Sequence, residues 1–126
     1  MSEPVEAPEK IVYITTYAAE HAEKATLPFV MANAALTMDV EAIVALQGGA
    51  VFLAWNGYQD HVFAPGLPPL KDLMKSFLDA GGKLLVCVPC LRERRIPETE
   101  LIEGAQPMAA AKLTLEILSA NAVISY

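Results

Sequence analysis

The sequence predicts a three-layer α/β domain in which a mainly parallel sheet has helices on both faces. Short apolar, β-branched runs alternate along the chain with longer segments whose apolar residues recur at helical spacing. Glycines and prolines mark the changes between the two kinds of segment. Strands that alternate with helices pair in parallel, because each helix carries the chain back across the sheet.

Four segments have the composition of strands, of which the first three are expected to be buried, and Gly48-Gly49 interrupts the chain just after the second. The predicted strands are Lys10–Thr16, Val40–Leu46, Lys83–Val88 and Ala122–Tyr126.

Three helices are predicted between these strands. Pro28 fits only the first turn of a helix, so we expect the first helix to begin near Thr26. Its expected apolar face consists of Leu27, Val30, Met31, Ala34, Ala35 and Met38. The second helix has an apolar face made of Leu70, Leu73, Met74, Phe77 and Leu78. Gly81-Gly82 is its expected C-cap, and Pro107 is the expected first residue of a last helix that runs to about Ser119.

The remaining segments are less regular. The run 50–55 fits either a helical turn or a short strand, and the proline-rich segment 56–69 is a predicted loop. Residues 89–95 resemble the start of a helix or a tight turn. The acidic stretch 1–9 contains two prolines and is a predicted flexible tail. We expect one domain over residues 1–126, a length that can bury a core without disulfides.

The composition of the chain indicates which binding partners to expect. Apolar residues make up 54% of the chain and the mean hydropathy is +0.35, so we expect a homo-oligomer that covers part of the apolar surface. The net charge is −6 and the pI is near 4.8. Because nucleic-acid binding requires a basic face, we expect no nucleic-acid partner.

No apolar run reaches the length of a membrane span, and the N-terminus lacks the features of a signal peptide. Two cysteines are too few for a secreted disulfide framework. We therefore expect a cytoplasmic protein without a membrane span.

Three polar segments follow predicted strands, and ligands of open parallel sheets bind at the carboxyl ends of the strands. These segments are 17–21, 47–49 and 87–90. Cys87 is the strongest candidate nucleophile among them, because it ends a strand where a helix begins. The N–H groups of that helix, together with Arg92, Arg94 and Arg95, favour a thiolate, so we expect Cys87 to titrate below about 8.5. A cysteine packed as a small apolar residue is the alternative.

Cys87-Val88-Pro89-Cys90 has three interpretations. A zinc site needs about four ligands, and only His21 and His61 remain as candidates, so we expect no metal and no cofactor. A reversible disulfide between the two cysteines suits the CxxC spacing. In the third interpretation Cys87 carries sulfur as a persulfide, with Cys90 as a second site residue or a bystander.

Other residues at this edge are candidate supporting groups. His21 is a candidate proton donor or thiolate partner, although a histidine in a surface loop is the simpler interpretation. Gln47 and Gly48 follow the second strand and are candidate supporting residues, since glycine can allow a ligand to approach closely. No phosphate-loop motif is present, so a turn is the simpler interpretation of Gly48-Gly49. Arg92 and Arg94 are the expected binding arginines.

The segment 83–100, KLLVCVPCLRERRIPETE, resembles the cysteine segment of the DsrE/DsrF-like family. In that family a strand ends in a cysteine, and an arginine-bearing turn and an acidic stretch follow. The other predicted strands and helices also match the family's pattern, over nearly the whole chain after the tail. Glu93-Arg94-Arg95-Ile96 departs from the arginine-glycine pair often found in the family.

The resemblance implies a YchN-like, flavodoxin-like fold, assembly into trimers or hexamers, and sulfur relay as in the TusBCD and DsrEFH subunits. It implies a persulfide on Cys87, with donor and acceptor proteins as partners and a sulfurtransferase as the enzyme class. A thiol-disulfide protein using Cys87 and Cys90 is one alternative. A non-catalytic protein that binds a small ligand or supports assembly is another.

Overall fold

The computed structural model describes residues 8–126, so most of the predicted acidic tail lies outside the described residues. In this described part of the chain, five strands form one parallel sheet with the order β4-β3-β2-β1-β5. Their bounds are β1 Lys10–Thr15, β2 Glu41–Leu46, β3 Lys83–Cys87, β4 Ala105–Met108 and β5 Ala122–Ser125. The parallel α/β class predicted from the sequence is confirmed, with β4 as an additional strand.

Within residues 8–126, four α-helices and four short 3-10 helices connect the strands. The α-helices are α1 Ala22–Thr37, α2 Leu70–Asp79, α3 Val88–Glu93 and α4 Ala110–Leu118. The 3-10 helices are η1 Ala19–His21, η2 Gly48–Ala54, η3 Tyr58–His61 and η4 Glu98–Glu100. The run 50–55, ambiguous in the sequence, therefore lies mostly within the helical turn η2.

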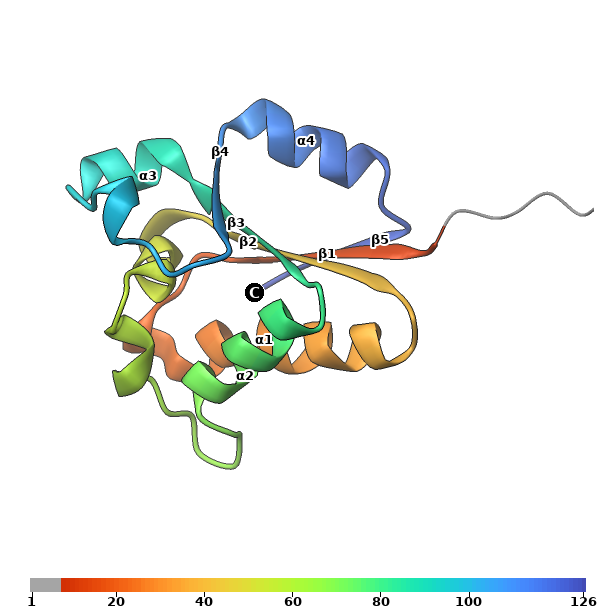
Figure 1. Cartoon of the computed structure of the whole chain (residues 1–126), viewed down its shortest axis with the longest axis horizontal. Helices are drawn as coiled ribbons and strands as arrows, with labels where there is room; N and C mark the ends of the chain where they lie inside the picture. Colours follow the sequence, from red (N-terminus) through yellow and green to blue (C-terminus); the bar gives the residue numbers. More distant parts are fainter. Residues whose placement is uncertain (1–7) are drawn as a thin grey trace, which may run out of the picture.

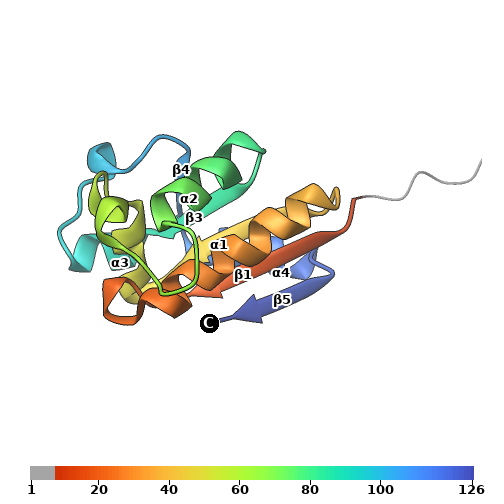
Figure 2. The ribbon, with the colours of Figure 1, turned by 90° about the horizontal axis from the view of Figure 1, so that it is seen from below.

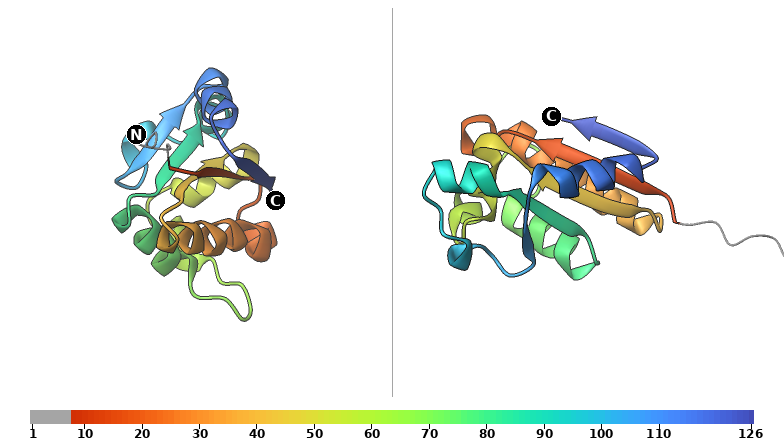
Figure 3. Two further views of the ribbon diagram at one scale, coloured as in Figure 1. Left: turned by 90° about the vertical axis from the view of Figure 1, so that its right-hand side faces the viewer. Right: turned by 90° about the horizontal axis from the view of Figure 1, so that it is seen from above.

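The helices form a layer on each face of the sheet. Helices α1 and α2 lie side by side on one face, and α4 lies on the other (Figure 1). Figure 2 shows α1 and α2 from their own side, and Figure 3 shows α4 from the opposite side. Helix α3 follows β3 directly at the carboxyl edge of the sheet.

Alternate residues of the central strands fill two cores, as a sheet with two covered faces requires. Tyr13, Val44 and Leu84 belong to the larger core beneath α1 and α2. Val12 and Ile43 belong to a smaller core, to which α4 contributes Leu113. Across residues 8–126, no helix combines the length and the apolar composition that crossing a membrane requires.

Helix α1 differs from the prediction in its start and in its buried face. It begins at Ala22, and its buried residues are Ala25, Thr26, Pro28, Phe29, Ala32 and Ala35. Of the face expected from spacing, only Ala35 is buried, whereas Met31 and Met38 are exposed. The prediction failed because α1 carries apolar residues around most of its circumference, so periodicity does not single out one face.

Pro28 lies well inside α1, where a proline leaves the carbonyl four residues earlier without its helical donor. That carbonyl belongs to Lys24, and the Thr15 hydroxyl at the end of β1 donates to it at 3.1 Å. Thr15 is fully buried. A strand side chain thus replaces the missing N–H group, which explains how the helix continues through Pro28.

Helix α2 ends as predicted at Gly81-Gly82. The N–H of Gly82 donates to the Phe77 carbonyl at 2.8 Å, and the N–H of Gly81 donates to Leu78 at 3.1 Å. This is a Schellman C-cap, and Gly81 supplies its left-handed residue with φ 90°. A Cβ on Gly82 would meet the ring of Phe77, which explains the second glycine.

The prediction for the segment around Pro107 was wrong. Pro107 lies in β4, and the last helix begins only at Ala110. β4 is an edge strand that pairs with β3 alone, and a proline is tolerated there because one side of the strand needs no ladder hydrogen bonds. With Gly104 before it and a proline inside it, this four-residue strand has little of the composition by which strands are recognised.

Candidate functional site

The three polar segments expected at one edge follow β1, β2 and β3, which end at the same edge of the sheet. The segments after β2 and β3 are in direct contact, because the Gly48 N–H donates to the Cys90 sulfur at 3.2 Å. Gly48 and Gly49 also lie against Thr16, the residue that follows β1. The carboxyl edge predicted from the strand order therefore brings all three segments together.

Cys87 is the last residue of β3 and the N-cap of α3, and Cys90 lies on the first turn of that helix. Both cysteines are free and half-buried, and their sulfur atoms are 2.8 Å apart. Cys87 contacts both cores, as expected for a residue at the end of a central strand. The CxxC spacing folds locally into one helical turn, which places the two sulfurs on the same side.

The expectation of an acidic Cys87 thiol was wrong. Burial raises the pKa of the Cys87 thiol above its ordinary value, and the neighbouring Cys90 sulfur adds to the increase. The backbone N–H of Cys90 and the charge of Arg94 oppose this effect without overcoming it. Helix α3 spans only six residues, so its dipole does not compensate for the loss of solvent.

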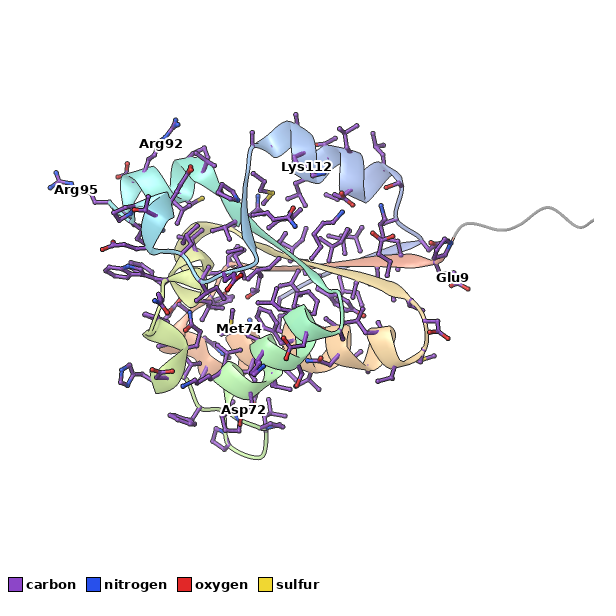
Figure 4. All side chains as sticks on the ribbon, in the orientation of Figure 1. Glu9, Asp72, Met74, Arg92, Arg95 and Lys112 are labelled. Atoms are coloured by element: carbon purple, nitrogen blue, oxygen red, sulfur yellow. The ribbon has the colours of Figure 1, made fainter. Side chains whose placement is uncertain are left out.

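The three arginines do not form the expected cluster around the sulfurs. Arg94 is half-buried and donates from Nη1 to the carbonyl of Cys90 at 3.3 Å. Arg92 and Arg95 are exposed and point away from the body of the molecule (Figure 4). Of the two arginines expected to support the site, the structure places only Arg94 against the cysteine turn.

His21 and Gln47 have local structural roles. The Nδ1 atom of His21 accepts from the Lys24 N–H at 3.3 Å and so caps α1, while the imidazole is exposed beside Tyr17. Gln47 is half-buried at the start of η2, and its backbone N–H donates to the Thr15 carbonyl at 3.1 Å. Neither side chain contacts a cysteine through a hydrogen bond in the described part of the chain.

Glu20 was not singled out from the sequence, and the contact that Tyr58 makes was not predicted. The Glu20 carboxylate accepts from the Ala18 N–H at 3.0 Å, and a Cβ on Gly49 would lie 3.6 Å from its Oε1 atom. The Tyr58 hydroxyl accepts from the Ala19 N–H at 3.0 Å and ties η3 to the segment after β1. A carboxylate in a loop that follows a strand was the available signal for Glu20.

A cavity elsewhere in the structure does not involve the cysteines. A cavity of about 560 Å³ lies between α2 and the segments 56–59 and 102–104, and neither cysteine lines it. Among residues 8–126, no three histidine, cysteine, aspartate or glutamate side chains come together in a metal-binding arrangement.

The fold and the site define a class of protein: a three-layer α/β domain with a cysteine pair at the carboxyl edge of a parallel sheet. The model of the DsrE/DsrF-like family matches residues 9–126. The chain therefore belongs to the DsrE/DsrF-like family, and the resemblance inferred from the cysteine segment is confirmed.

Among curated proteins, the chain is 35% identical over 111 residues to an uncharacterized protein of Methanocaldococcus jannaschii, MJ0760. The match covers 88% of this chain but only 40% of that relative, which is therefore much longer.

Solved structures agree in fold. The YchN protein of E. coli superposes with a TM-score of 0.79 at 21% identity, covering 94% of this chain and 99% of that one. The protein MTH1491 of Methanobacterium thermoautotrophicum gives a TM-score of 0.73 at 11% identity, with the same coverage. BT1422 of Bacteroides thetaiotaomicron gives 0.67 at 16% identity, covering 94% and 95% of the two chains. At such identities the likeness defines the fold alone.

Proposed function

We propose that the protein is a sulfur carrier that holds sulfur as a persulfide on Cys87. The observation that carries this proposal is the half-buried Cys87 at the carboxyl end of β3, with a second sulfur 2.8 Å away. Membership of a family with sulfur-relay members supports the same chemistry. Partial burial protects a persulfide from solvent, while the remaining exposure leaves a path for a donor.

Loading would be a transfer of neutral sulfur. The Cys87 thiolate attacks the outer sulfur of a donor persulfide, R–S–SH, and a new S–S bond forms while the donor S–S bond breaks. The donor leaves as R–S⁻ and takes up a proton from water. Cys87 is left as Cys87–S–SH, so the atoms and electrons balance without an oxidant.

Cys87→Ser tests the carrier assignment. The wild-type protein treated with cysteine persulfide should gain the mass of one sulfur on Cys87, whereas the serine variant should gain none, because its hydroxyl is a poor nucleophile. Intact-protein and peptide mass spectrometry measure the gain. Cys90→Ser is the matched control and should load normally. Normal loading of Cys87→Ser would exclude the proposal.

Loading should also depend on pH in a defined direction. Because the pKa of Cys87 is raised, its thiolate fraction at neutral pH is small and grows as the pH rises. The rate of alkylation at Cys87, followed by peptide mass spectrometry, should still be increasing above pH about 8.5. A rate that levels off below pH 8 would mean that the thiol is more acidic than its surroundings predict.

A thiol-disulfide redox protein is the second candidate function, and the short separation of the two sulfurs favours it. In that case either serine substitution would abolish the reversible disulfide, and the two variants would behave alike. The mass spectrum of the oxidised wild type would show the loss of two hydrogens and no gain of sulfur. A chain that neither loads sulfur nor forms the disulfide would instead fit a binding or assembly role.

We further propose that the carrier works as a homo-oligomer, a trimer or hexamer, and receives and delivers sulfur through partner proteins. Its apolar composition and exposed leucines support self-association. Persulfide chemistry requires free thiols, so we expect the protein to work in a reducing compartment such as the cytoplasm.

A further inference from the structure

Cys90 has no part in the proposed loading step, yet contacts hold both its side chain and its backbone in place. Its sulfur accepts from the Gly48 N–H at 3.2 Å and lies 2.8 Å from the Cys87 sulfur. Its carbonyl accepts from Arg94 at 3.3 Å. Contacts from η2 and from the end of α3 therefore fix Cys90 beside the atom that the proposed function would modify.

We propose that Cys90 is a resolving cysteine that attacks the Cys87 persulfide and releases hydrosulfide. This inference rests on the proposed carrier function and extends it, because it assigns a second reacting residue and a free inorganic product. The chain's own CxxC pair would then release the sulfur, and an acceptor protein would receive it as hydrosulfide and not by direct transfer to its own thiol.

The step balances as a thiol-disulfide exchange. The Cys90 thiolate attacks the Cys87 Sγ, a Cys87–Cys90 bond forms, and the bond to the outer sulfur breaks. The outer sulfur leaves as HS⁻, carrying the electron pair of the broken bond. The result is an intramolecular disulfide, and two equivalents of a thiol reductant return it to the dithiol while they are oxidised to their own disulfide.

Geometry favours attack at the inner sulfur. The two Sγ atoms need to approach by less than 1 Å from their 2.8 Å separation to reach the bonding distance of about 2.05 Å. Both residues lie within one turn of the chain, at the N-cap and the first turn of α3, so the approach needs no movement between elements.

The leaving group also favours attack at the inner sulfur. A thiol of lower pKa leaves faster in exchange reactions. Burial and the Cys90 sulfur raise the pKa of Cys87, which makes the Cys87 thiolate a poor leaving group. Attack on the outer sulfur would have to expel that thiolate, whereas attack on the inner sulfur expels hydrosulfide, the anion of a stronger acid than an alkyl thiol.

The Gly48 N–H supports the attacking sulfur. The Gly48 N–H holds the Cys90 Sγ beside the Cys87 Sγ, the atom that it would attack. Gly48 has φ 55°, a conformation that glycine adopts without strain and that directs the start of η2 toward α3. Gly48, a candidate supporting residue in the sequence, thus contacts the second cysteine.

A single-turnover experiment on the full chain tests the inference. The protein is loaded with cysteine persulfide and desalted into thiol-free buffer. Hydrosulfide is then trapped and the protein mass is followed over time. Wild-type protein should release about one hydrosulfide per chain, and its mass should fall from one added sulfur to the dithiol mass less two hydrogens. Because a neighbouring thiol acts at high effective concentration, Cys90→Ser should retain the sulfur and release it at least about a hundredfold more slowly.

The variants separate this inference from the carrier proposal. If neither wild type nor Cys90→Ser gains sulfur on Cys87, the carrier function fails and this inference fails with it. If both load but release hydrosulfide at equal rates, or if fragment spectra find the added sulfur moved to Cys90, only the resolving role is overturned. Ser76→Ala, an exposed position on α2, is the matched control and should behave as wild type. Cys90→Ala provides a second variant if thermal unfolding shows that the serine disturbs the fold.

Discussion

Arg95 adopts a left-handed backbone conformation, with φ 54°, at the end of α3. Its N–H donates to the Arg92 carbonyl at 3.1 Å, and the Ile96 N–H donates to the Leu91 carbonyl at 3.0 Å. These bonds form a Schellman C-cap, whose left-handed position favours glycine. Arg95 therefore lies at the one residue of this turn where a side chain causes strain.

Replacing Arg95 by glycine should relieve this strain. We expect Arg95→Gly to raise the free energy of unfolding by about 1 kcal/mol, since a left-handed conformation costs other residues about that much. Arg92→Gly is the matched control, because the same substitution inside α3 should lower stability by about 1 kcal/mol. Urea unfolding measures both. Equal losses in the two variants would show that the φ of Arg95 is not a source of strain.

The sequence could identify the residues proposed to react better than the residues expected to support them. The order of the predicted strands gave the common location of Cys87, Cys90 and Gly48, because parallel strands end at one edge of the sheet. The roles of Arg92 and His21 depend on the directions of their side chains, and the spacing of residues in the sequence does not determine these directions. The pKa of Cys87 depends on how far burial outweighs nearby donors, a balance that requires the packed structure.

At the scale of elements, α1 depends on a contact between Thr15 and the carbonyl that Pro28 leaves free. Thr15→Val removes the donor and leaves the Lys24 carbonyl without it, so we expect a loss of about 1–3 kcal/mol in the free energy of unfolding. In a Pro28→Ala background the alanine N–H can donate to Lys24 instead. The same Thr15→Val substitution should then cost about 1 kcal/mol less.

A double-mutant cycle by chemical denaturation measures this coupling. Thr15 also accepts from the Tyr17 N–H at 3.3 Å, but that contact is lost equally in both backgrounds and cancels. Additive effects of the two substitutions would show that the threonine does not compensate for the proline.

Elements whose own residues form a clear pattern were predicted well. Elements that depend on contacts with neighbouring elements were not. The central strands and α2 follow from β-branched runs and a clear apolar face. Strand β4 exists because β3 offers it a partner, and its own residues include Pro107. The buried face of α1 is chosen by the sheet and by α2, since the helix itself is apolar on most sides.

Across the whole molecule, one buried carboxylate attaches α4 to the sheet. Glu116 contacts Lys10 of β1 at 3.0 Å and Lys83 of β3 at 3.4 Å, and Lys112 lies 3.4 Å away on the same helix. Burial acts to raise the pKa of the Glu116 carboxyl, but the lysines outweigh it, so the pKa lies below its ordinary value.

This cluster predicts a pH dependence. Because the folded pKa of Glu116 is lowered, its stabilisation is present above the unfolded value of about 4.3 and is lost as the pH falls through the folded pKa. Glu116→Gln should lower the free energy of unfolding by about 1–3 kcal/mol at pH 7. The difference from wild type should shrink below pH about 4.3. Glu98→Gln, at an exposed position, is the control for general charge effects.

The last prediction concerns assembly. Leu115 and Leu118 of α4 are 65% and 77% exposed, and Val123 and Ile124 of the neighbouring edge strand β5 are 43% and 36% exposed. An apolar helix face beside an open sheet edge is a surface that proteins usually cover. We therefore expect the proposed homo-oligomer to use α4 and β5 in its subunit contacts.

Light scattering at micromolar concentration should report three or more subunits for the wild type. Leu115→Glu with Leu118→Glu should reduce the mass, because two carboxylates in a contact between copies would be buried without partners. Met38→Glu, at an apolar residue of α1 that is 73% exposed, is the matched control and should leave the assembly intact. A wild-type monomer would contradict the oligomer itself. Dissociation by Met38→Glu alone would place the contact on α1 instead of α4.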